Sequence, residues 1–421
     1  MKVLWFSNTP CGATEKLTGV PVTGGSWLFA LSEEIAKYKE MELHIAFYWS
    51  KQEKSFLYKG ITYHPILRNG YGSKFGRYLY RLKQQFDENP DDIEIDRLFE
   101  VYNKIKPDIV HFHGSEENFG LLAEKINTPM VLSIQGILSP IFYKYYSGFQ
   151  RSEVFRTESY LVKLMVDGYG ANERRMKHRL ARERRILKAI PNILGRTNWD
   201  RDCSLYFNPS RRYFICNEIL RSEFMSSEWK QPNSDFPFVL STTISNGIYK
   251  GLEMVYTTAK LLLDAKVPFK WIVIGLDRHD ALVNMTQKIT GIYHADVNIE
   301  LIGRKNALEI VDVLNSSHAF VQVSHIENSP NSLCEAMVLG MPIIASYAGG
   351  TASLLEDGKE GVLVQDGDPY RLAGAIINMM QDYSHAVEMG KAARSKALIR
   401  HSSTNVLEEL RNAYYEITKS N

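Results

Sequence analysis

Short runs of β-branched and aromatic residues alternate with longer helical patterns along the whole chain of 421 residues. This alternation predicts parallel sheets covered by helices on both faces, because parallel strands are joined by crossover helices. Each half of the chain holds six such runs, so we expect an α/β protein with two doubly wound, Rossmann-like domains. The runs are 3–9, 44–49, 108–113, 130–136, 193–197 and 213–217, then 238–243, 270–275, 299–303, 319–324, 342–347 and 361–365.

A polar segment, residues 220–237, separates the two halves and shows no sustained hydrophobic period. We interpret it as a linker between an N-terminal domain, residues 1–219, and a C-terminal domain, residues 238–399. Two sheets joined by a hinge form a cleft, and ligands of open α/β sheets bind beyond the carboxyl ends of the strands. Functional residues are therefore expected in the loops that follow strands.

Charge and cysteine content exclude several classes of protein. The 50 Lys and Arg residues nearly balance 48 Asp and Glu residues, which does not favour nucleic-acid binding. The four cysteines form no C-x-x-C pair, and this is typical of unbridged thiols in a reducing compartment.

The N-terminus lacks a secretory apolar region, and the uncharged stretches 126–143 and 336–355 are interrupted by Gly and Pro. We interpret both stretches as buried strands with turns.

The segment HIENSPNSLCEAMVLGMPIIASYAGG, residues 325–350, carries the densest functional signal. A short helix is predicted from Ser332 to Gly340, with its N-terminus able to bind a phosphate through free N–H groups. Glu327 precedes this helix, and Glu335 lies one turn inside it, where a carboxylate could accept both hydroxyls of a ribose. Two plainer interpretations remain open: Ser332 and Glu335 could form a capping box, and Glu327 could be a solvated loop residue.

E-x7-E followed by A-M-x-x-G-x-P-I-I-A-x-x-x-G-G resembles the signature of the retaining glycosyltransferases of family 4, which have the GT-B fold. The Lys250-Gly251 pair looks like the family's K-G element. Four further segments lie at positions where chains of this family have similar segments: 21–36, 106–114, 361–376 and 403–418. The resemblance implies that a C-terminal helix at about 400–421 joins the N-terminal domain.

The resemblance also implies a donor site and an acceptor site. Lys250 and Glu327 would be catalytic, with Lys250 on the donor diphosphate and Glu327 facing the sugar, and Glu335 would bind the ribose. The other residues implied for the nucleotide sugar are Gly25, Gly303, Arg304, Ser329, Asn331, Ser332 and Leu333, with the base near Gly303 and Arg304. Those implied for the acceptor or sugar side are Gly24, His113, Gln135 and Arg196.

The sequence departs from the family at two places. The family often has an Arg about six residues before the Lys, where this chain has Thr242, Thr243 and Ile244. Arg196 or Arg304 could replace that cation, or both could be structural. A histidine often found after the fourth N-terminal strand appears here as Gln135.

Three further patterns have competing interpretations. Asp366-Gly-Asp368 resembles a metal-binding D-x-D, but Asp-Gly followed by Asp-Pro favours a turn and a helix N-cap, so we expect no metal. His111 is expected in the core, whereas His113, at the strand tip, could contact substrate.

Residues 151–188 carry a local charge of +6, and the helix expected at 172–190 follows the aromatic stretch 139–149. This helix is either a solvated outer helix or, with residues 139–190, a contact to an anionic membrane surface.

The resemblance therefore implies a retaining, metal-independent glycosyltransferase that moves a sugar from a UDP-, GDP- or ADP-sugar to a glycan or lipid-linked acceptor in surface polysaccharide synthesis. No cofactor is expected. The alternative is a catalytically silent sugar-nucleotide-binding module or scaffold. Nucleic-acid binding through the basic helix is disfavoured, because no RNA-binding sheet motif accompanies it. We expect the protein in the cytoplasm, with a peripheral position on the inner face of the membrane left open.

Overall fold

The computed structural model describes residues 1–20, 27–68, 75–76, 78–80, 82, 92–159, 168–232 and 237–419. They form two compact units. Unit 1 comprises residues 1–139, 158–219 and 401–421, and unit 2 comprises residues 140–157 and 220–400. Within the described ranges, no helix combines the length and the apolar character needed to cross a bilayer.

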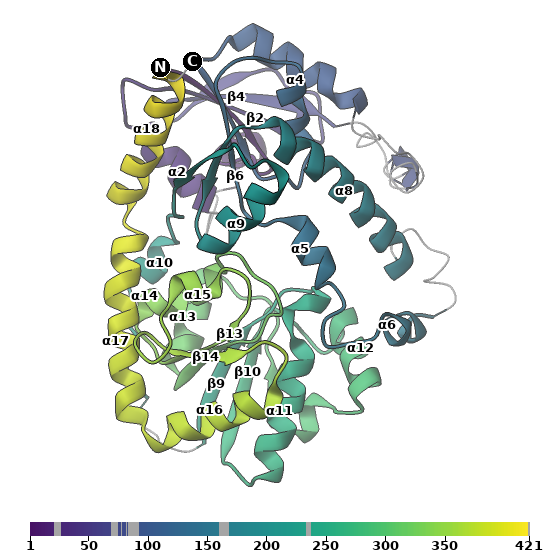
Figure 1. Cartoon of the computed structure of the whole chain (residues 1–421), viewed down its shortest axis with the longest axis vertical. Helices are drawn as coiled ribbons and strands as arrows, with labels where there is room; N and C mark the ends of the chain where they lie inside the picture. Colours follow the sequence, from purple (N-terminus) through teal and green to yellow (C-terminus); the bar gives the residue numbers. More distant parts are fainter. Residues whose placement is uncertain are drawn as a thin grey trace. The chain divides into compact units, whose positions relative to one another are not determined.

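Unit 1 is built on an eight-stranded sheet in the order β3-β4-β2-β1-β5-β6-β7-β8 (Figure 1). All neighbouring strands pair in parallel except β3 and β4, which form an antiparallel hairpin. The strands are β1 (Lys2–Ser7), β2 (Glu42–Trp49), β3 (Phe56–Tyr58), β4 (Ile61–Leu67), β5 (Ile109–His113), β6 (Met130–Ser133), β7 (Asn192–Gly195) and β8 (Arg212–Ile215). The six strands expected in this half are present, and the hairpin is additional.

Helices cover both faces of this sheet. Alternate residues of β1 point to opposite faces, so Val3 and Trp5 enter one apolar cluster while Leu4 and Phe6 enter the other. The first cluster is closed by α1 (Ala13–Thr18), α2 (Trp27–Ile35) and α18 (Ser403–Lys419). The second cluster is closed by α4 (Asp92–Ile105), η1 (Phe119–Glu124), α8 (Tyr169–Ala189) and α9 (Asn198–Phe207).

Unit 2 contains a six-stranded parallel sheet in the order β11-β10-β9-β12-β13-β14. In chain order this is 3-2-1-4-5-6, the Rossmann arrangement. The strands are β9 (Phe238–Thr243), β10 (Phe269–Ile274), β11 (Ile299–Leu301), β12 (Ala319–Gln322), β13 (Ile343–Tyr347) and β14 (Val362–Gln365). All six match the strands expected from the sequence.

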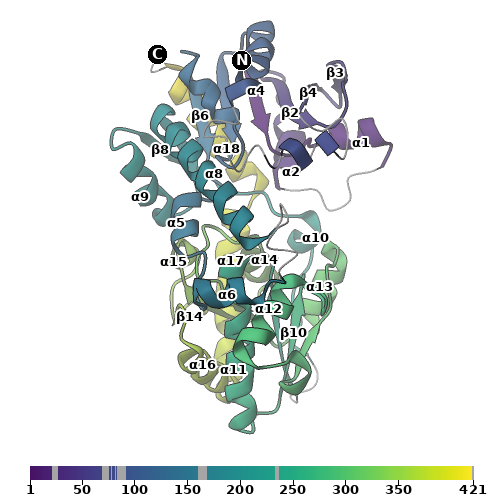
Figure 2. The ribbon, with the colours of Figure 1, turned by 90° about the vertical axis from the view of Figure 1, so that its right-hand side faces the viewer.

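The helices of unit 2 also form two layers, one of which faces the viewer in Figure 2. The helices α11 (Leu252–Asp264), α12 (Ala281–Thr290) and α16 (Pro369–Gln381) pack together, with α6 (Arg151–Thr157) against α12. On the other face lie α10 (Ser222–Met225), α13 (Ala307–Asn315), α14 (Asn331–Leu339) and α17 (Tyr383–Arg400). Short elements complete the unit: η2 (Ile248–Lys250), η3 (His294–Asp296) and α15 (Thr351–Leu354).

The units differ from the expected domains at two places, residues 140–157 and the linker. Residues 140–157 were expected in the N-terminal domain but cluster with unit 2, and the short helix α5 (Leu138–Tyr143) spans that boundary. Much of the expected linker is packed: Phe224 is fully buried, and Trp229 donates its indole N–H to the Ser317 carbonyl at 2.9 Å. The C-terminal helix α18 belongs to unit 1, where Trp5 Nε1 donates to Tyr414 Oη at 2.8 Å.

Candidate functional site

The strand order of unit 2 reverses between β9 and β12, and the residues that follow these two strands meet there. Lys250 ends η2, which follows β9, while Glu327 lies in the loop after β12. Lys250 Nζ lies 2.5 Å from Glu327 Oε1, and both side chains are mostly buried. Burial would lower the pKa of Lys250, but the charge of Glu327 outweighs it and raises that pKa. The ammonium therefore stays charged at the position where such sheets bind ligands.

Close backbone packing fixes Lys250 against the β12 side. Gly251 has φ 78°, and a Cβ atom there would lie 2.3 Å from the Val323 carbonyl oxygen. The neighbouring backbone is also linked, because His325 N donates to the Tyr249 carbonyl at 2.9 Å. Glycine after Lys250 is thus required by the fold, which explains the K-G pair.

The Gly349-Gly350 pair holds the backbone of Glu327. Gly350 N donates to the Glu327 carbonyl at 2.9 Å. A Cβ atom on Gly349, which has φ 55°, would lie 2.0 Å from that carbonyl oxygen. The two glycines therefore let the loop after β13 approach the Glu327 loop, and a larger residue at Gly349 would displace Glu327.

Glu335 lies on α14, which follows the Glu327 loop and ends at Gly340 with φ 87°. The helix begins at Asn331 after Pro330, and no side-chain capping bond is present at this described end. The capping-box interpretation is therefore wrong. Glu335 Oε1 instead accepts a hydrogen bond from Arg221 Nε at 2.8 Å. Burial raises the pKa of Glu335 to about 7, although Arg221 opposes the shift.

The other described residues implied for the nucleotide follow β11 or lie at the start of α14 and just before it. Gly303 follows β11 with φ 69°, and Arg304 beside it is exposed. Ser329 is buried, with Oγ 3.7 Å from Cys334 Sγ. In the first turn of α14, Asn331 is exposed, Ser332 is half-buried and Leu333 is fully buried, so only the backbone of Leu333 is suited to bind a ligand. Gly24 and Gly25 lie outside the described residues.

A cluster of four ionisable groups lies beside the Glu327 loop and was missed by the sequence interpretation. His325 Nε2 contacts the Glu253 carboxylate, and His325 Nδ1 lies 2.5 Å from Asp366 Oδ1. Lys144 Nζ contacts the other oxygen of Asp366 at 3.1 Å. Burial would lower the pKa of His325, but the two carboxylates raise it to about 9. The cluster thus ties α11, the β12 loop and the β14 loop together through one imidazolium.

The D-x-D pattern forms a turn, as expected. Gly367 has φ 76°, and Asp368 caps α16 by accepting from Arg371 N at 2.9 Å. Asp366 is committed to His325 and Lys144. The two carboxylates of the pattern therefore belong to two different local structures.

The two histidines of β5 in unit 1 have different partners. His111 is a core residue, with Nδ1 2.6 Å from Tyr414 Oη and Nε2 2.7 Å from Ser133 Oγ. His113 is equally buried, but neither ring nitrogen has a hydrogen-bond partner among the described residues. Its ring lies 4.4 Å from that of Trp5 between centroids, and burial holds the pKa of His113 well below its usual value. A neutral imidazole with unused polar atoms suits a hydroxyl-bearing ligand.

Arg196 is buried in unit 1, where Arg196 Nε lies 3.3 Å from Glu218 Oε2 and the guanidinium lies over the Trp27 ring. This arrangement fits the structural interpretation of Arg196. Gln135 lies close to Gly114, since a Cβ atom at Gly114 would be 3.6 Å from Gln135 Nε2. The polar group after β6 is therefore at the carboxyl edge of the sheet of unit 1.

The basic helix α8 packs against the rest of unit 1 through one face. Glu183 is fully buried and accepts from Ser115 Oγ and Leu138 N, each at 2.8 Å. Arg182, one residue before Glu183, donates a hydrogen bond to the Glu116 carbonyl. Ile186 and Leu187 pack into the second apolar cluster of unit 1, which also contains Leu4 and Phe6. The helix therefore positions the loops after β5 and β6 of unit 1.

Two Rossmann-like units with these strand orders match solved GT-B glycosyltransferases. Sucrose-phosphate synthase from Thermosynechococcus elongatus is 14% identical with a TM-score of 0.71, and each chain is covered completely. HepE of Anabaena, solved with UDP and glucose, is 14% identical with a TM-score of 0.63 over 99% of this chain and 100% of its own. WaaG, a glycosyltransferase of lipopolysaccharide biosynthesis, is 13% identical with a TM-score of 0.60 over 98% of both chains. The expected GT-B fold is confirmed.

The sequence comparisons identify a family and several relatives that are similar to part of the chain. Residues 233–396 match the family Glycosyl transferases group 1, which confirms the resemblance to glycosyltransferases. The amylovoran biosynthesis glycosyltransferase AmsK of Erwinia amylovora is 28% identical over 155 residues, 35% of this chain and 37% of AmsK. The capsular polysaccharide biosynthesis glycosyltransferase CapM of Staphylococcus aureus is 26% identical over 177 residues, 40% of this chain and 44% of CapM. The matched regions thus span under half of each relative.

Proposed function

We propose that the protein is a retaining glycosyltransferase of surface polysaccharide synthesis, which transfers a sugar from a UDP-, GDP- or ADP-sugar to a glycan or lipid-linked acceptor. The observation that carries the proposal is the ion pair of Lys250 and Glu327 at the point where the strand order of a group 1 glycosyltransferase domain reverses. The relatives named for amylovoran and capsular polysaccharide support the acceptor class. HepE, solved with UDP and glucose, supports the donor class.

In this proposal, the diphosphate of the donor lies against Lys250 and the backbone N–H groups that open α14. The ribose lies at Glu335, the base lies near Gly303 and Arg304, and the sugar faces Glu327. Transfer breaks the bond between the sugar and the phosphate, so negative charge develops on the departing diphosphate. A buried ammonium held in advance at that place stabilises the charge without reorganisation. Same-face attack by the acceptor hydroxyl, with its proton passing to the departing phosphate, retains the anomeric configuration.

The reacting end of the acceptor would bind to unit 1, at the carboxyl edge of its sheet. His113 and Gln135 supply polar groups there, and Gly24 with Gly25 would supply the loop implied by the resemblance. The unused ring nitrogens of His113 support this proposal. Arg196 contributes through packing, because Glu218 and Trp27 already occupy its guanidinium.

A donor assay separates this enzyme from the alternative, a silent sugar-nucleotide-binding module. Thermal-shift screening with UDP, GDP, ADP and their sugars identifies the nucleotide, and the matching nucleotide sugar is then followed for sugar release over hours. We expect slow hydrolysis without acceptor and faster turnover with one. Binding without any release would favour the silent module.

We also propose that the reaction needs no divalent metal. Asp366 is paired with His325 and Lys144, and Asp368 caps α16, so the D-x-D carboxylates are already committed. Sugar release should therefore be unchanged in EDTA. Loss of release in EDTA that returns with added Mg²⁺ or Mn²⁺ would contradict the metal-independent mechanism.

Replacement of Glu335 tests the ribose contact. We expect Glu335→Gln to weaken binding of the matching nucleotide about 10-fold, because a charge-assisted hydrogen bond becomes a neutral one. The pKa of Glu335 is raised to about 7, so the carboxylate is lost as the pH falls through that value. Wild-type affinity should therefore drop toward that of the variant between pH 8 and pH 6, as measured by titration calorimetry.

The exposed Glu356, which pairs with Lys359 in the same unit, is the control for Glu335. Glu356→Gln should bind the nucleotide as the wild type does at every pH. Equal affinities for Glu335→Gln and Glu356→Gln would remove Glu335 from the donor site.

We propose a cytoplasmic protein with a peripheral position on the inner face of the membrane. Residues 139–190 include the basic helix α8, on which Arg174, Lys177 and Arg184 lie outside its buried face. Such cations attract anionic lipid at roughly 1 kcal/mol each near the surface. Flotation with anionic vesicles should carry the protein upward and neutral vesicles should not; no flotation with anionic vesicles would exclude the membrane contact.

A further inference from the structure

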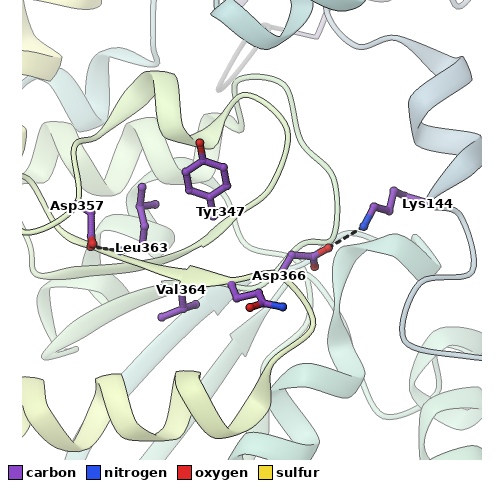
Figure 3. A pocket seen from close by; sticks show the side chains of 7 residues that line it. Lys144, Tyr347, Asp357, Leu363, Val364 and Asp366 are labelled. Carbon is purple, nitrogen blue, oxygen red and sulfur yellow. Dashed lines mark hydrogen bonds and ion pairs between the residues drawn. The ribbon is translucent and has the colours of Figure 1, made fainter.

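A cavity of unit 2 lies along β14 and at the carboxyl end of β13, and neither Lys250 nor Glu327 lines it. Its volume is about 570 Å³. Figure 3 shows Tyr347 at the end of β13, Asp366 at the end of β14 and Lys144 reaching Asp366 from the segment after α5. Asp357 and Leu363 also line the cavity, on the same side as Tyr347 in Figure 3. Nothing in the catalytic scheme above uses this cavity.

Tyr347 is an unusual residue in its strand. Ile343, Ile344, Ala345 and Ser346 of β13 are buried, whereas Tyr347 is 63% exposed and lines the cavity. An exposed aromatic ring beside a cavity offers a flat apolar surface together with a polar hydroxyl. The C–H face of a sugar ring is apolar while its rim carries hydroxyls, so it matches such a surface.

Two of the three charged side chains that line the cavity form an ion pair with each other. Lys144 Nζ lies 3.1 Å from Asp366 Oδ2, and the other oxygen of Asp366 contacts His325. Asp357 Oδ1 accepts from Leu363 N at 2.8 Å. The lining thus presents one cation and two carboxylates, with the cation held by a carboxylate. This balance disfavours a phosphate and suits a neutral polyol, which needs both donors and acceptors.

The position of the cavity relates it to the donor site. Glu327 follows β12, and β13 and β14 are the next two strands in the sheet order. Neighbouring strands lie about 4.8 Å apart, so β14 is about 10 Å from β12. Asp366 connects the two regions directly, because it holds His325, two residues before Glu327. A glycan that reached the transferred sugar could therefore place a neighbouring sugar unit in this cavity.

We propose that the cavity lined by Tyr347, Asp366 and Lys144 is a carbohydrate subsite that binds a neutral sugar unit of the glycan acceptor. The proposal rests on the proposed function for the identity of the glycan as acceptor. The sugar ring stacks on Tyr347, and its hydroxyls pair with the carboxylates and the ammonium.

Saturation-transfer NMR with the full-length protein tests the subsite, with maltose, lactose and N,N′-diacetylchitobiose as probes at millimolar concentration. Tyr347→Ala removes the stacking surface, which should weaken binding of at least one probe by about 5- to 10-fold. Tyr370→Ala is the matched control, because Tyr370 is 74% exposed in the same unit but does not line the cavity. It should leave every signal at the wild-type level.

Thermal shifts with the matching nucleotide are measured on the same variants, so that the two proposals are tested separately. If probe binding depends on Tyr347 but the wild type shows no thermal shift with any nucleotide, the subsite is supported and the proposed function is rejected. A normal nucleotide shift with probe signals that are absent from the wild type, or equal in Tyr347→Ala and the wild type, would overturn the subsite alone.

Discussion

Replacing Lys250 with alanine should lower the rate of sugar transfer about 100- to 1000-fold, which corresponds to a loss of about 3–4 kcal/mol of transition-state stabilisation. The reason is the role of its ammonium, which lies at the switch point of the sheet and is kept charged by Glu327. Without it, the charge that develops on the departing diphosphate meets only backbone N–H groups. Steady-state kinetics with the matching nucleotide sugar measures the effect.

Lys260 provides the control for this substitution, since it lies on α11, pairs with Asp264 and is about half exposed. Lys260→Ala should keep wild-type turnover. Lys250→Arg should recover part of the loss, because it restores the charge but not the shape of the ammonium. Turnover of Lys250→Ala within about fivefold of the wild type would reject the catalytic assignment of Lys250.

The imidazolium of His325 should make unit 2 more stable at mildly acidic than at alkaline pH. Burial opposes its charge, but contacts with Asp366 and Glu253 raise the pKa to about 9 from the ordinary 6.5. The stabilisation is therefore complete below about pH 6.5 and is lost as the pH rises through 9. The shift corresponds to on the order of 3 kcal/mol in the free energy of unfolding.

The free energy of unfolding of the wild type minus that of His325→Gln isolates this contribution. We expect a large difference at pH 6 that shrinks steadily toward pH 10. His385, an exposed histidine of α17, gives the control, and His385→Gln should show no such trend. A difference that stays constant over this pH range would show that His325 is not an imidazolium in the folded protein.

Most of the strands could be predicted because each buried strand of a parallel sheet reads as a short apolar run. The hairpin of β3 and β4 could not, since Pro65 argues against a strand there. The structure accommodates Pro65 because β3 pairs with β4 only as far as Tyr63, and no other described strand pairs with the outer side of β4 beyond that point. Lys59 and Gly60, with φ 48° and 77°, form the turn between these strands.

The candidate site was predictable where its residues lie close together in the sequence or follow neighbouring strands. Glu327, Glu335 and the Gly349-Gly350 pair lie in one segment, and Lys250 follows the adjacent strand β9. Arg221 was missed because it lies in a polar segment with no periodicity, 114 positions before Glu335. His325 was missed as well, because Glu253 and Asp366 are 72 and 41 positions away and only the fold brings them together.

The most direct test of the donor site is a crystal structure of the protein with the nucleotide diphosphate that gives the largest thermal shift. The account predicts that the diphosphate lies within hydrogen-bonding distance of Lys250 Nζ and of the N–H groups that open α14, with the ribose hydroxyls at the Glu335 carboxylate. A nucleotide bound elsewhere, with Lys250 still paired only with Glu327, would contradict it.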